Sequence, residues 1–160
     1  MKKKKLISII VPVYNESEVI EAFYKRVREV IYSLSNYAYE IIFVDDGSKD
    51  GSYQNLVNLA DFDRHVEIIK FSRNFGHQTA ITAGMDHSKG DAVVIIDADL
   101  QDPPEVIKKF IDKWQEGYDV VFGIRERREG ESRIKLFTAS SFYRLLKRIA
   151  KIDIPIDVGD

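Results

Sequence analysis

Three polar residues at alternate positions, Asp97, Asp99 and Gln101, follow a short apolar run in the sequence. The run, residues 93–96, is rich in β-branched side chains and too short for a helix, which predicts a buried strand. In an extended chain, residues two positions apart share a face and lie about 6.5 Å apart, so the two carboxylates can converge. Two carboxylates this close repel each other unless a cation joins them. Mg²⁺ or Mn²⁺ suits such oxygens, and Gln101 adds a neutral third ligand.

Hydrophobic periodicity predicts strands that alternate with helices along the chain. The expected fold is therefore α/β, with a mainly parallel sheet and helices on both faces. Ser17 is the predicted N-cap of the first helix, and Ala80, Ala83 and Gly84 are expected to let the third helix pack closely. The predicted strands span residues 6–13, 40–45, 66–71, 93–96 and 119–123, and the predicted helices span residues 19–34, 53–60, 78–87 and 103–116.

Polar residues follow each predicted strand at its carboxyl end. In open α/β sheets, ligands bind outside these ends. Taken alone, an Asp-x-Asp pair is also explained by solvated acids at a strand end, but five polar sets on one rim favour a single cleft. The sets are Tyr14, Asn15 and Glu16; Asp45 and Asp46; Arg73 and Asn74; Asp97, Asp99 and Gln101; and Arg125.

The composition fits one domain, residues 1–160, because 160 residues with 44% hydrophobic content can bury a sizeable core. The absence of cysteine excludes disulfides and thiolate metal sites. No apolar stretch approaches the roughly 20 residues of a membrane span, and the basic N-terminus leads into a first strand, not a signal peptide. The final IPIDVGD has no helix cap or polar tail, which we expect of a chain truncated within a longer protein.

Residues 125–151 concentrate positive charge, with nine Lys and Arg against three Asp and Glu. Such a charge suggests an anionic partner. Ile134, Phe137, Leu145 and Ile149 recur on one side of this segment. We interpret it as a basic amphipathic helix that lies at a membrane surface. The alternative is an ordinary surface helix packed on the sheet.

Four motifs together resemble a known enzyme family. They are PVYNE at residues 12–16, VDDGS at 44–48, RNFGHQTA at 73–80 and DADLQDPPE at 97–105. The set resembles the family-two glycosyltransferases with the GT-A fold, and RNFGHQ followed by DADLQDPPE is similar to the polyprenyl-phosphate hexose transferases. The resemblance covers essentially the whole chain, and the motifs are specific in combination.

The resemblance implies a role for individual residues at each motif. Asp46 is implied to contact the nucleotide base, and the terminal IDVGD resembles the start of the family's acceptor motif. The implied nucleotide-sugar residues are Pro12, Tyr14, Glu16, Asp46 and Asp97; the implied Mg²⁺ or Mn²⁺ ligands are Asp97, Asp99 and Gln101; the implied acceptor-phosphate residues are Arg125 and Arg133; and the candidate catalytic residues are Asp99, Asp157 and Asp160.

The chemistry of sugar transfer agrees with this assignment. Displacing a nucleoside diphosphate from a sugar builds negative charge on the leaving phosphate, which a divalent cation stabilises. A hydroxyl acceptor would need a general base, whereas a phosphate monoester with a second pKa of about 6 is already largely dianionic at pH 7. Base candidates are few, chiefly Asp157 and Asp160, because we interpret His77 as a loop hydrogen-bonder and His87 as a helix-end residue. This scarcity favours a lipid phosphate as the acceptor.

We therefore predict a metal-dependent inverting hexosyltransferase that uses a UDP- or GDP-linked sugar and a polyprenyl phosphate at the cytoplasmic membrane face. These 160 residues are themselves expected to be soluble and to bind no nucleic acid. The hexose, the nucleotide and the oligomeric state stay open. The alternatives are a fragment that binds nucleotide sugar without turnover, and a transferase with a saccharide hydroxyl acceptor. A HAD-type phosphatase is disfavoured. Its Asp-x-Asp motif normally follows the first strand and has Thr or Val two residues after the second Asp, whereas here the motif follows the fourth predicted strand and that residue is Gln101.

The charge of residues 125–151 generates a first prediction. Each Lys or Arg near an anionic surface contributes about 1 kcal/mol, and salt screens this attraction. Residues 1–160 should therefore co-sediment with anionic vesicles at low salt and release at high salt. Changing Arg144, Lys147, Arg148 and Lys151 to Gln should remove most of the binding. Equal sedimentation of the quadruple variant, or equal binding to neutral vesicles, would contradict a membrane-surface role.

Overall fold

The computed structural model describes residues 4–123 of the chain. Its contacts divide the chain into two compact units, residues 1–112 and 113–160, each of which is described by itself. The elements in chain order are β1 (Leu6–Val13), α1 (Ile20–Ser33), β2 (Ala38–Asp45), α2 (Ser52–Phe62), β3 (Val66–Lys70), α3 (His77–His87), β4 (Ala92–Ile95) and α4 (Val106–Gln115).

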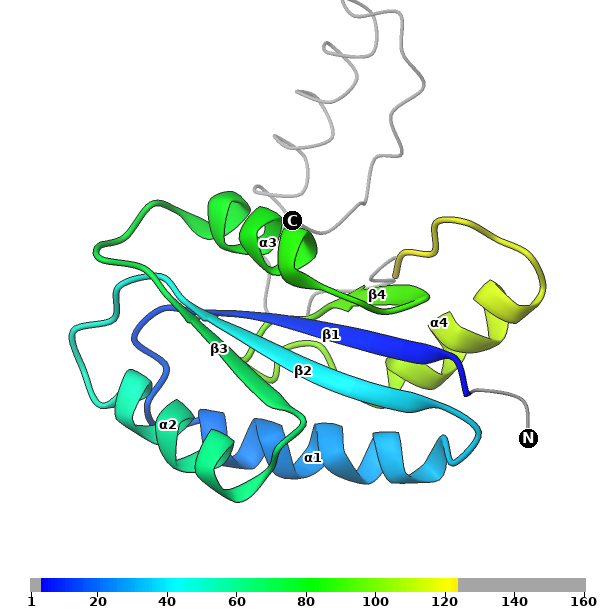
Figure 1. Cartoon of the computed structure of the whole chain (residues 1–160), viewed down its shortest axis with the longest axis horizontal. Helices are drawn as coiled ribbons and strands as arrows, with labels where there is room; N and C mark the ends of the chain where they lie inside the picture. The colour runs from blue at the N-terminus through cyan, green and yellow to red at the C-terminus, as the bar shows by residue number, and fades with distance from the viewer. Residues whose placement is uncertain (1–3, 124–160) are drawn as a thin grey trace, which may run out of the picture. The chain divides into compact units, whose positions relative to one another are not determined.

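The four strands form one sheet in the order β3-β2-β1-β4, and every pairing is parallel. Helices α1 and α2 cover one face of this sheet, and α3 covers the other (Figure 1). This arrangement confirms the predicted α/β class with helices on both faces. The chain runs from β1 outward through β2 to β3 and then returns to place β4 on the opposite side of β1. The strand order therefore reverses between β1 and β4, where ligands bind in folds of this kind.

The two central strands form the core. Every residue of β1 from Ile7 to Val13 and of β2 from Glu40 to Asp45 is buried, because parallel strands between two helix layers expose neither face. Helix α1 places residues at helical spacing against this sheet, including Phe23, whose ring meets that of Phe43 edge to face at 6.4 Å. The continuous apolar runs in the sequence thus correspond to the two strands buried on both sides.

Helix α3 packs closely on the opposite face through small residues, as predicted. Ala80 and Gly84 are buried in this helix. A Cβ atom added at Gly84 would overlap Cγ2 of Ile10 and lie 3.3 Å from Cγ2 of Val44. The helix backbone therefore approaches β1 and β2 more closely than any larger side chain would permit.

A buried polar cluster closes the amino-terminal edge of the sheet. The Ser8 hydroxyl donates to Oε1 of Glu40 at 2.5 Å, and the same oxygen accepts the Lys89 backbone N–H at 2.8 Å. The Ser8 oxygen in turn accepts the Gly90 N–H at 2.9 Å. These bonds satisfy a buried carboxylate and join β1, β2 and the turn before β4.

The first helix begins later than predicted. Helix α1 starts at Ile20, its N-cap is Val19, and no side chain caps it. The prediction that Ser17 is the N-cap is therefore wrong. Ser17 lies in the loop before the helix, where its backbone N–H donates to Asp50 at 3.1 Å. The backbone N–H groups of Val19 and Ile20 both reach the Glu16 carbonyl, which begins the helical turn without a cap.

The fourth strand is less buried than predicted. Val94 and Ile96 are buried, but Val93 and Ile95 are 39% and 43% exposed, because β4 pairs only with β1 in the described part of the chain. The predicted fifth strand over residues 119–123 does not form in the residues described. After Gly117, which turns with φ of 100°, Val120 and Phe122 stay largely exposed at 79% and 54%. Apolar β-branched residues alone do not make a strand when no ladder partner is present.

No helix within residues 4–123 is long and apolar enough to cross a membrane. The basic segment 125–151, Arg125, Arg133, Asp157 and Asp160 lie outside the described residues. Their predicted roles stay predictions.

The close approach of α3 generates a second prediction. Overpacking a core costs about 1–3 kcal/mol, which exceeds the helix-propensity gain of about 1 kcal/mol from replacing glycine. Gly84→Leu should therefore lower the free energy of unfolding by about 2 kcal/mol in urea titrations. Met85→Leu, at a neighbouring exposed position, should change it by less than about 0.5 kcal/mol. Equal midpoints for both variants would contradict this packing.

Candidate functional site

A cavity of about 230 Å³ lies at the carboxyl ends of the strands, at the point where the strand order reverses. Loops after β1, β2, β3 and β4 all contribute to its wall, so the structure brings members of four of the five predicted polar sets together. Arg125, the fifth, lies outside the described residues. The members of the other four sets that do not line the cavity are Asn15, Asp45, Arg73 and Gln101. The lining residues are Pro12, Val13, Tyr14, Glu16, Asp46, Asn74, His77, Ala80, Asp97, Ala98 and Asp99.

The Asp-x-Asp segment reaches this cavity by a turn and not by continuing the strand. Strand β4 ends at Ile95, and Leu100 adopts the left-handed region with φ of 61°, which is unusual for a bulky residue. The Asp99 carboxylate accepts the Gln101 backbone N–H at 2.9 Å and fixes this turn. Asp97 and Asp99 both line the cavity, but Gln101 is exposed and lies outside the lining. The same-face argument for Gln101 is therefore wrong, and its role as a metal ligand stays a prediction.

The cavity concentrates negative charge. Partial burial raises the pKa of Glu16, and the neighbouring carboxylates of Asp99, Asp50 and Asp97 raise it further. The one cationic candidate in the lining is His77, whose Nε2 lies 3.7 Å from Oδ1 of Asp97. Carboxylates that repel one another in a pocket favour a bound cation.

The donor set fits a hard divalent cation only in part. Asp97 and Asp99 supply two carboxylates, the oxygen ligands that Mg²⁺ and Mn²⁺ prefer. Within residues 4–123, no three His, Asp or Glu side chains are grouped closely enough to hold a metal ion by themselves. A cation bound here would therefore take its other ligands from water or from a second ligand such as a diphosphate.

Asp46 anchors the loop that leads into α3. Its side chain is almost fully buried, and its two carboxylate oxygens accept the N–H groups of Phe75 at 2.7 Å and Gly76 at 3.0 Å. The adjoining Gly47 has a φ of 71°, and a Cβ atom there would overlap the backbone of Arg73. These contacts give Asp46 a structural role beside its predicted contact with a nucleotide base, which stays a prediction.

One polar residue of the cavity wall differs from the sequence-based expectation. Asn74 lines the cavity as its place on the predicted rim indicates, whereas His77, expected to be a structural loop residue, also lines it. The signal was present in the RNFGHQ motif, but the contact with Asp97 depends on how α3 crosses the sheet. His87 behaves as predicted, since its Nδ1 lies 2.8 Å from the Ala83 carbonyl at the end of α3.

Asp50 lies in the loop beside the cavity and is strongly hydrogen-bonded. Partial burial alone would raise its pKa, but hydrogen bonds from Ser52 and from Ser17 outweigh this effect and lower it to about 2. Both carboxylate oxygens are engaged, Oδ1 by Ser52 and Oδ2 by the Ser17 N–H. The ionised form of Asp50 is therefore part of the folded structure.

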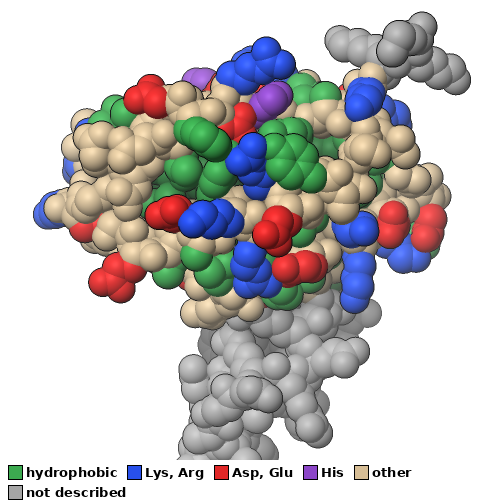
Figure 2. Space-filling model, turned by 90° about the horizontal axis from the view of Figure 1, so that it is seen from below, with side chains coloured by type: hydrophobic (Ala, Val, Ile, Leu, Met, Phe, Trp, Pro, Cys, Tyr) green, Lys and Arg blue, Asp and Glu red, His purple; other side chains and the backbone are tan. Residues whose placement is uncertain are grey.

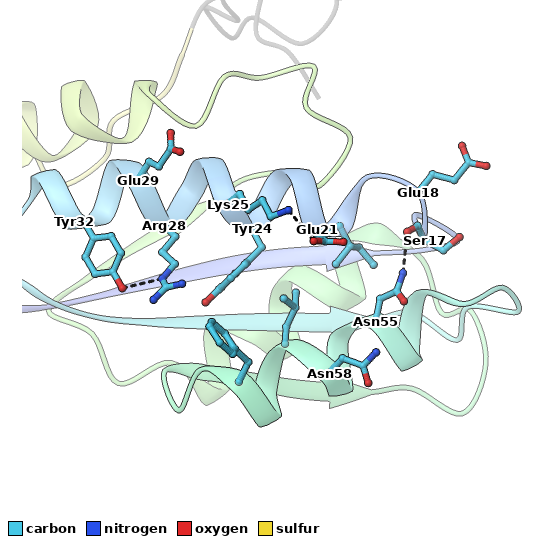
Figure 3. A pocket seen from close by; sticks show the side chains of 13 residues that line it. Ser17, Glu18, Glu21, Tyr24, Lys25, Arg28, Glu29, Tyr32, Asn55 and Asn58 are labelled. Atoms are coloured by element: carbon cyan, nitrogen blue, oxygen red, sulfur yellow. Dashed lines mark hydrogen bonds and ion pairs between the residues drawn. The ribbon is translucent and has the colours of Figure 1, made fainter.

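A larger groove of about 650 Å³ lies between α1 and α2 (Figure 3). On this face of the molecule, charged side chains of both signs surround a hydrophobic group (Figure 2). Its cations are occupied by the protein itself: Lys25 pairs with Glu21 at 2.7 Å, and Arg28 donates to the Tyr32 hydroxyl at 2.8 Å. The groove lacks the convergent carboxylates of the smaller cavity, so the smaller cavity is the candidate site.

Comparison with known families gives one match over most of the chain. A model described as glycosyl transferase family 2 matches residues 8–160. The uncharacterized glycosyltransferase YkcC of Bacillus subtilis is 56% identical over 153 residues, which cover 96% of this chain and 47% of that protein. The bactoprenol glucosyl transferase of Shigella phage SfX is 48% identical over 154 residues, covering 96% of this chain and 50% of that protein. The chain thus spans about half the length of these relatives.

Two solved structures share the fold. The mannosyltransferase PcManGT of Pyrobaculum calidifontis, solved with GDP-Man and Mn²⁺, superposes with a TM-score of 0.62 at 24% identity, covering 88% of this chain and 38% of its own. Glucosyl-3-phosphoglycerate synthase of Mycobacterium tuberculosis, solved with Mn²⁺, UDP and glucosyl-3-phosphoglycerate, gives a TM-score of 0.54 at 19% identity, with coverages of 69% and 39%. These likenesses confirm the predicted GT-A fold.

The lowered pKa of Asp50 generates a third prediction. Its pKa is about 2 in the folded chain against an ordinary value of 3.8, so its charged form favours folding. This contribution is complete above about pH 4 and is lost as the pH falls toward 2. Asp50→Asn should therefore reduce the pH dependence of unfolding free energy between pH 4 and pH 2.5 in urea titrations. Asp61→Asn, an exposed control on α2, should keep the slope of the parent chain; equal slopes for Asp50→Asn and the parent would contradict the assignment.

Proposed function

Because this chain belongs to glycosyl transferase family 2, we propose that its carboxyl-end cavity binds a UDP- or GDP-linked hexose. We propose further that the whole protein transfers this hexose, with inversion, to a polyprenyl phosphate at the cytoplasmic face of a membrane. The observation that carries the proposal is the convergence of Glu16, Asp46, Asp97 and Asp99 in one cavity at the reversal of the strand order. The lipid-phosphate acceptor is supported by the 48% identical relative named bactoprenol glucosyl transferase.

The cavity residues divide the work of donor binding. Pro12, Tyr14 and Glu16 come from the end of β1 and would line the nucleotide pocket, with Asp46 near the base. Asp97 and Asp99 would hold Mg²⁺ or Mn²⁺ together with the diphosphate of the donor. The bound cation would supply Lewis-acid stabilisation of the charge that develops on the leaving diphosphate.

This arrangement makes metal and nucleotide binding interdependent. Two carboxylates provide only part of a divalent cation's coordination, and the diphosphate provides further oxygens. Without the cation, the diphosphate would instead face the carboxylates of Glu16, Asp97 and Asp99, which repel it. Each ligand is therefore expected to bind weakly in the absence of the other.

The residues that we propose to bind the acceptor lie beyond residue 123, outside the described part of the chain. A phosphate monoester is already largely dianionic near pH 7 and has no proton that must be removed, so transfer to it requires positioning and charge neutralisation more than a general base. Arg125 and Arg133 are the proposed phosphate contacts, and the basic segment 125–151 is the proposed membrane-side element. Asp99, Asp157 and Asp160 are the proposed catalytic carboxylates, of which the last two would act as bases if the acceptor were a saccharide hydroxyl.

The fourth prediction tests this proposal. UDP or GDP should bind in calorimetry only when Mn²⁺ is present, because the cation and the diphosphate complete each other's contacts. Asp99→Ala should weaken this metal-dependent binding by at least tenfold while leaving the melting temperature close to that of the parent. Asp86→Ala, an exposed aspartate on α3, is the matched control and should bind as the parent does.

Transfer to an added polyprenyl phosphate, followed by mass spectrometry of the lipid product, then tests the acceptor. Product with the phosphate and none with the dephosphorylated polyprenol is the expected result. Unchanged Mn²⁺-dependent affinity in Asp99→Ala would contradict the metal site. If the whole protein binds nucleotide sugar but transfers the hexose to neither lipid, the proposal that polyprenyl phosphate is the acceptor is contradicted.

A further inference from the structure

The loop that carries Glu16 into the cavity is held by side chains of another loop. Three consecutive backbone N–H groups after β1 donate outward: Asn15 to Oγ of Ser48 at 3.0 Å, Glu16 to Oγ of Ser52 at 2.8 Å, and Ser17 to Oδ2 of Asp50 at 3.1 Å. The three acceptors, Ser48, Ser52 and Asp50, all belong to one short stretch of chain after β2, so the two loops are joined at three points. No strand pairing holds this part of the chain, and these bonds replace it.

The second loop is bonded to the first in return. The Lys49 N–H donates to Oδ1 of Asn15 at 2.8 Å, and the Asn55 amide donates to the Ser17 carbonyl at 2.9 Å, as the dashed line in Figure 3 marks. Asn15 itself adopts the left-handed region with φ of 57°, a conformation that asparagine tolerates better than most residues. The loop is thus fixed in both directions and in a conformation that a free loop would seldom adopt.

Asp50 determines how the Ser52 hydroxyl is used. A serine hydroxyl has one proton to donate and lone pairs to accept with. The Ser52 hydroxyl donates to Oδ1 of Asp50, so its oxygen is left as the acceptor for the Glu16 N–H. Ser52 is fully buried, which leaves no water to replace either bond. Removing Ser52 therefore leaves the Glu16 N–H without its partner, and removing Asp50 takes away the acceptor that orients the Ser52 hydroxyl for this bond.

The fixed loop holds Glu16 where its charge is least favoured. The Glu16 side chain lines the cavity beside Asp97 and Asp99, which repel its carboxylate. A freely moving loop would relieve this repulsion by turning the side chain toward solvent. Backbone anchors limit the movement of the loop and hold the backbone of Glu16 beside the cavity before any ligand arrives.

We propose that Asp50 and Ser52 are positioning residues, which preorganise Glu16 for the nucleoside diphosphate without touching it. This inference rests on the proposed function for the ligand it names. Neither residue lines the cavity. Ser52 is uncharged and so acts on binding through the loop that it holds, whereas Asp50 acts both through the loop and through the repulsion of its carboxylate on Glu16. Because a preorganised loop pays no ordering cost on binding, its loss should weaken nucleotide affinity and raise KM more than it lowers kcat.

The test compares Asp50→Asn and Ser52→Ala with Asp61→Asn in the full chain. Asp61→Asn removes an equivalent exposed carboxylate from α2 and is the matched control. Hydrogen exchange of the peptide covering residues 14–18 reports the loop anchors directly. In both positioning variants, exchange of this peptide should speed up at least tenfold more than exchange of β1 and β2 does, whereas the control should match the parent.

Calorimetry with UDP and GDP in the presence of Mn²⁺ then reports the consequence. Each positioning variant should bind the preferred nucleotide at least tenfold more weakly than the parent. In a double-mutant cycle, Ser52→Ala should add little to the loss already caused by Glu16→Gln, because Ser52 acts through Glu16. Additive losses, or parent-like affinity in the positioning variants, would overturn the inference.

The two proposals fail in different ways. A parent chain that binds neither nucleotide would overturn the proposed function and the ligand named here. A parent that binds nucleotide, with loop exchange unchanged in Asp50→Asn and Ser52→Ala, would overturn the positioning role alone. Uniformly faster exchange across the sheet in both variants would also overturn it, because it would indicate general destabilisation.

Discussion

Repulsion between carboxylates at the carboxyl end of the sheet is the constraint around which the site is built. Glu16 from the loop after β1 shares one cavity with Asp97 and Asp99 from the loop after β4. Partial burial raises the pKa of Glu16, and repulsion by these carboxylates raises it further. A single hydrogen bond contributes about 1 kcal/mol, and several such bonds hold the loop that carries Glu16.

The topology of the sheet determines where the site lies, and hydrogen bonds from side chains fix the loops around it. Parallel strands bring all their carboxyl ends to one edge, and the reversal between β1 and β4 leaves room there. The opposite edge has a buried carboxylate too, but Oε1 of Glu40 accepts hydrogen bonds from the Ser8 hydroxyl and the Lys89 N–H. Glu40 therefore stabilises the fold, whereas Glu16, Asp97 and Asp99 line a cavity in which they repel one another. Carboxylates at the two edges thus differ in effect because their surroundings differ.

The sequence predicted the fold better than the details of the site, for physical reasons. The bounds of β1 follow directly from its apolar run, since a strand buried on both faces needs little else. The turn at Leu100 could not be read from alternation, because its left-handed conformation is imposed by the surrounding loop and not by leucine itself. The contact of His77 with Asp97 joins two loops through the crossing of α3, a distance in sequence that no local pattern encodes. Ser17 satisfied the rule for an N-cap, but Asp50 offered its backbone a competing partner.

Strain and charge gather at the same place in this chain. Among residues 4–123, the two non-glycine residues with positive φ are Asn15 and Leu100, and they lie in the two loops that carry Glu16 and Asp99. A non-glycine residue in the left-handed region costs about 1–2 kcal/mol, so both loops are held in unfavourable conformations next to unfavourable charge. The rest of the fold must offset these costs through the buried strands β1 and β2 and the loop anchors. The proposed cation and diphosphate would remove the electrostatic part of this cost on binding, and would so gain affinity from repulsion that the folded chain already contains.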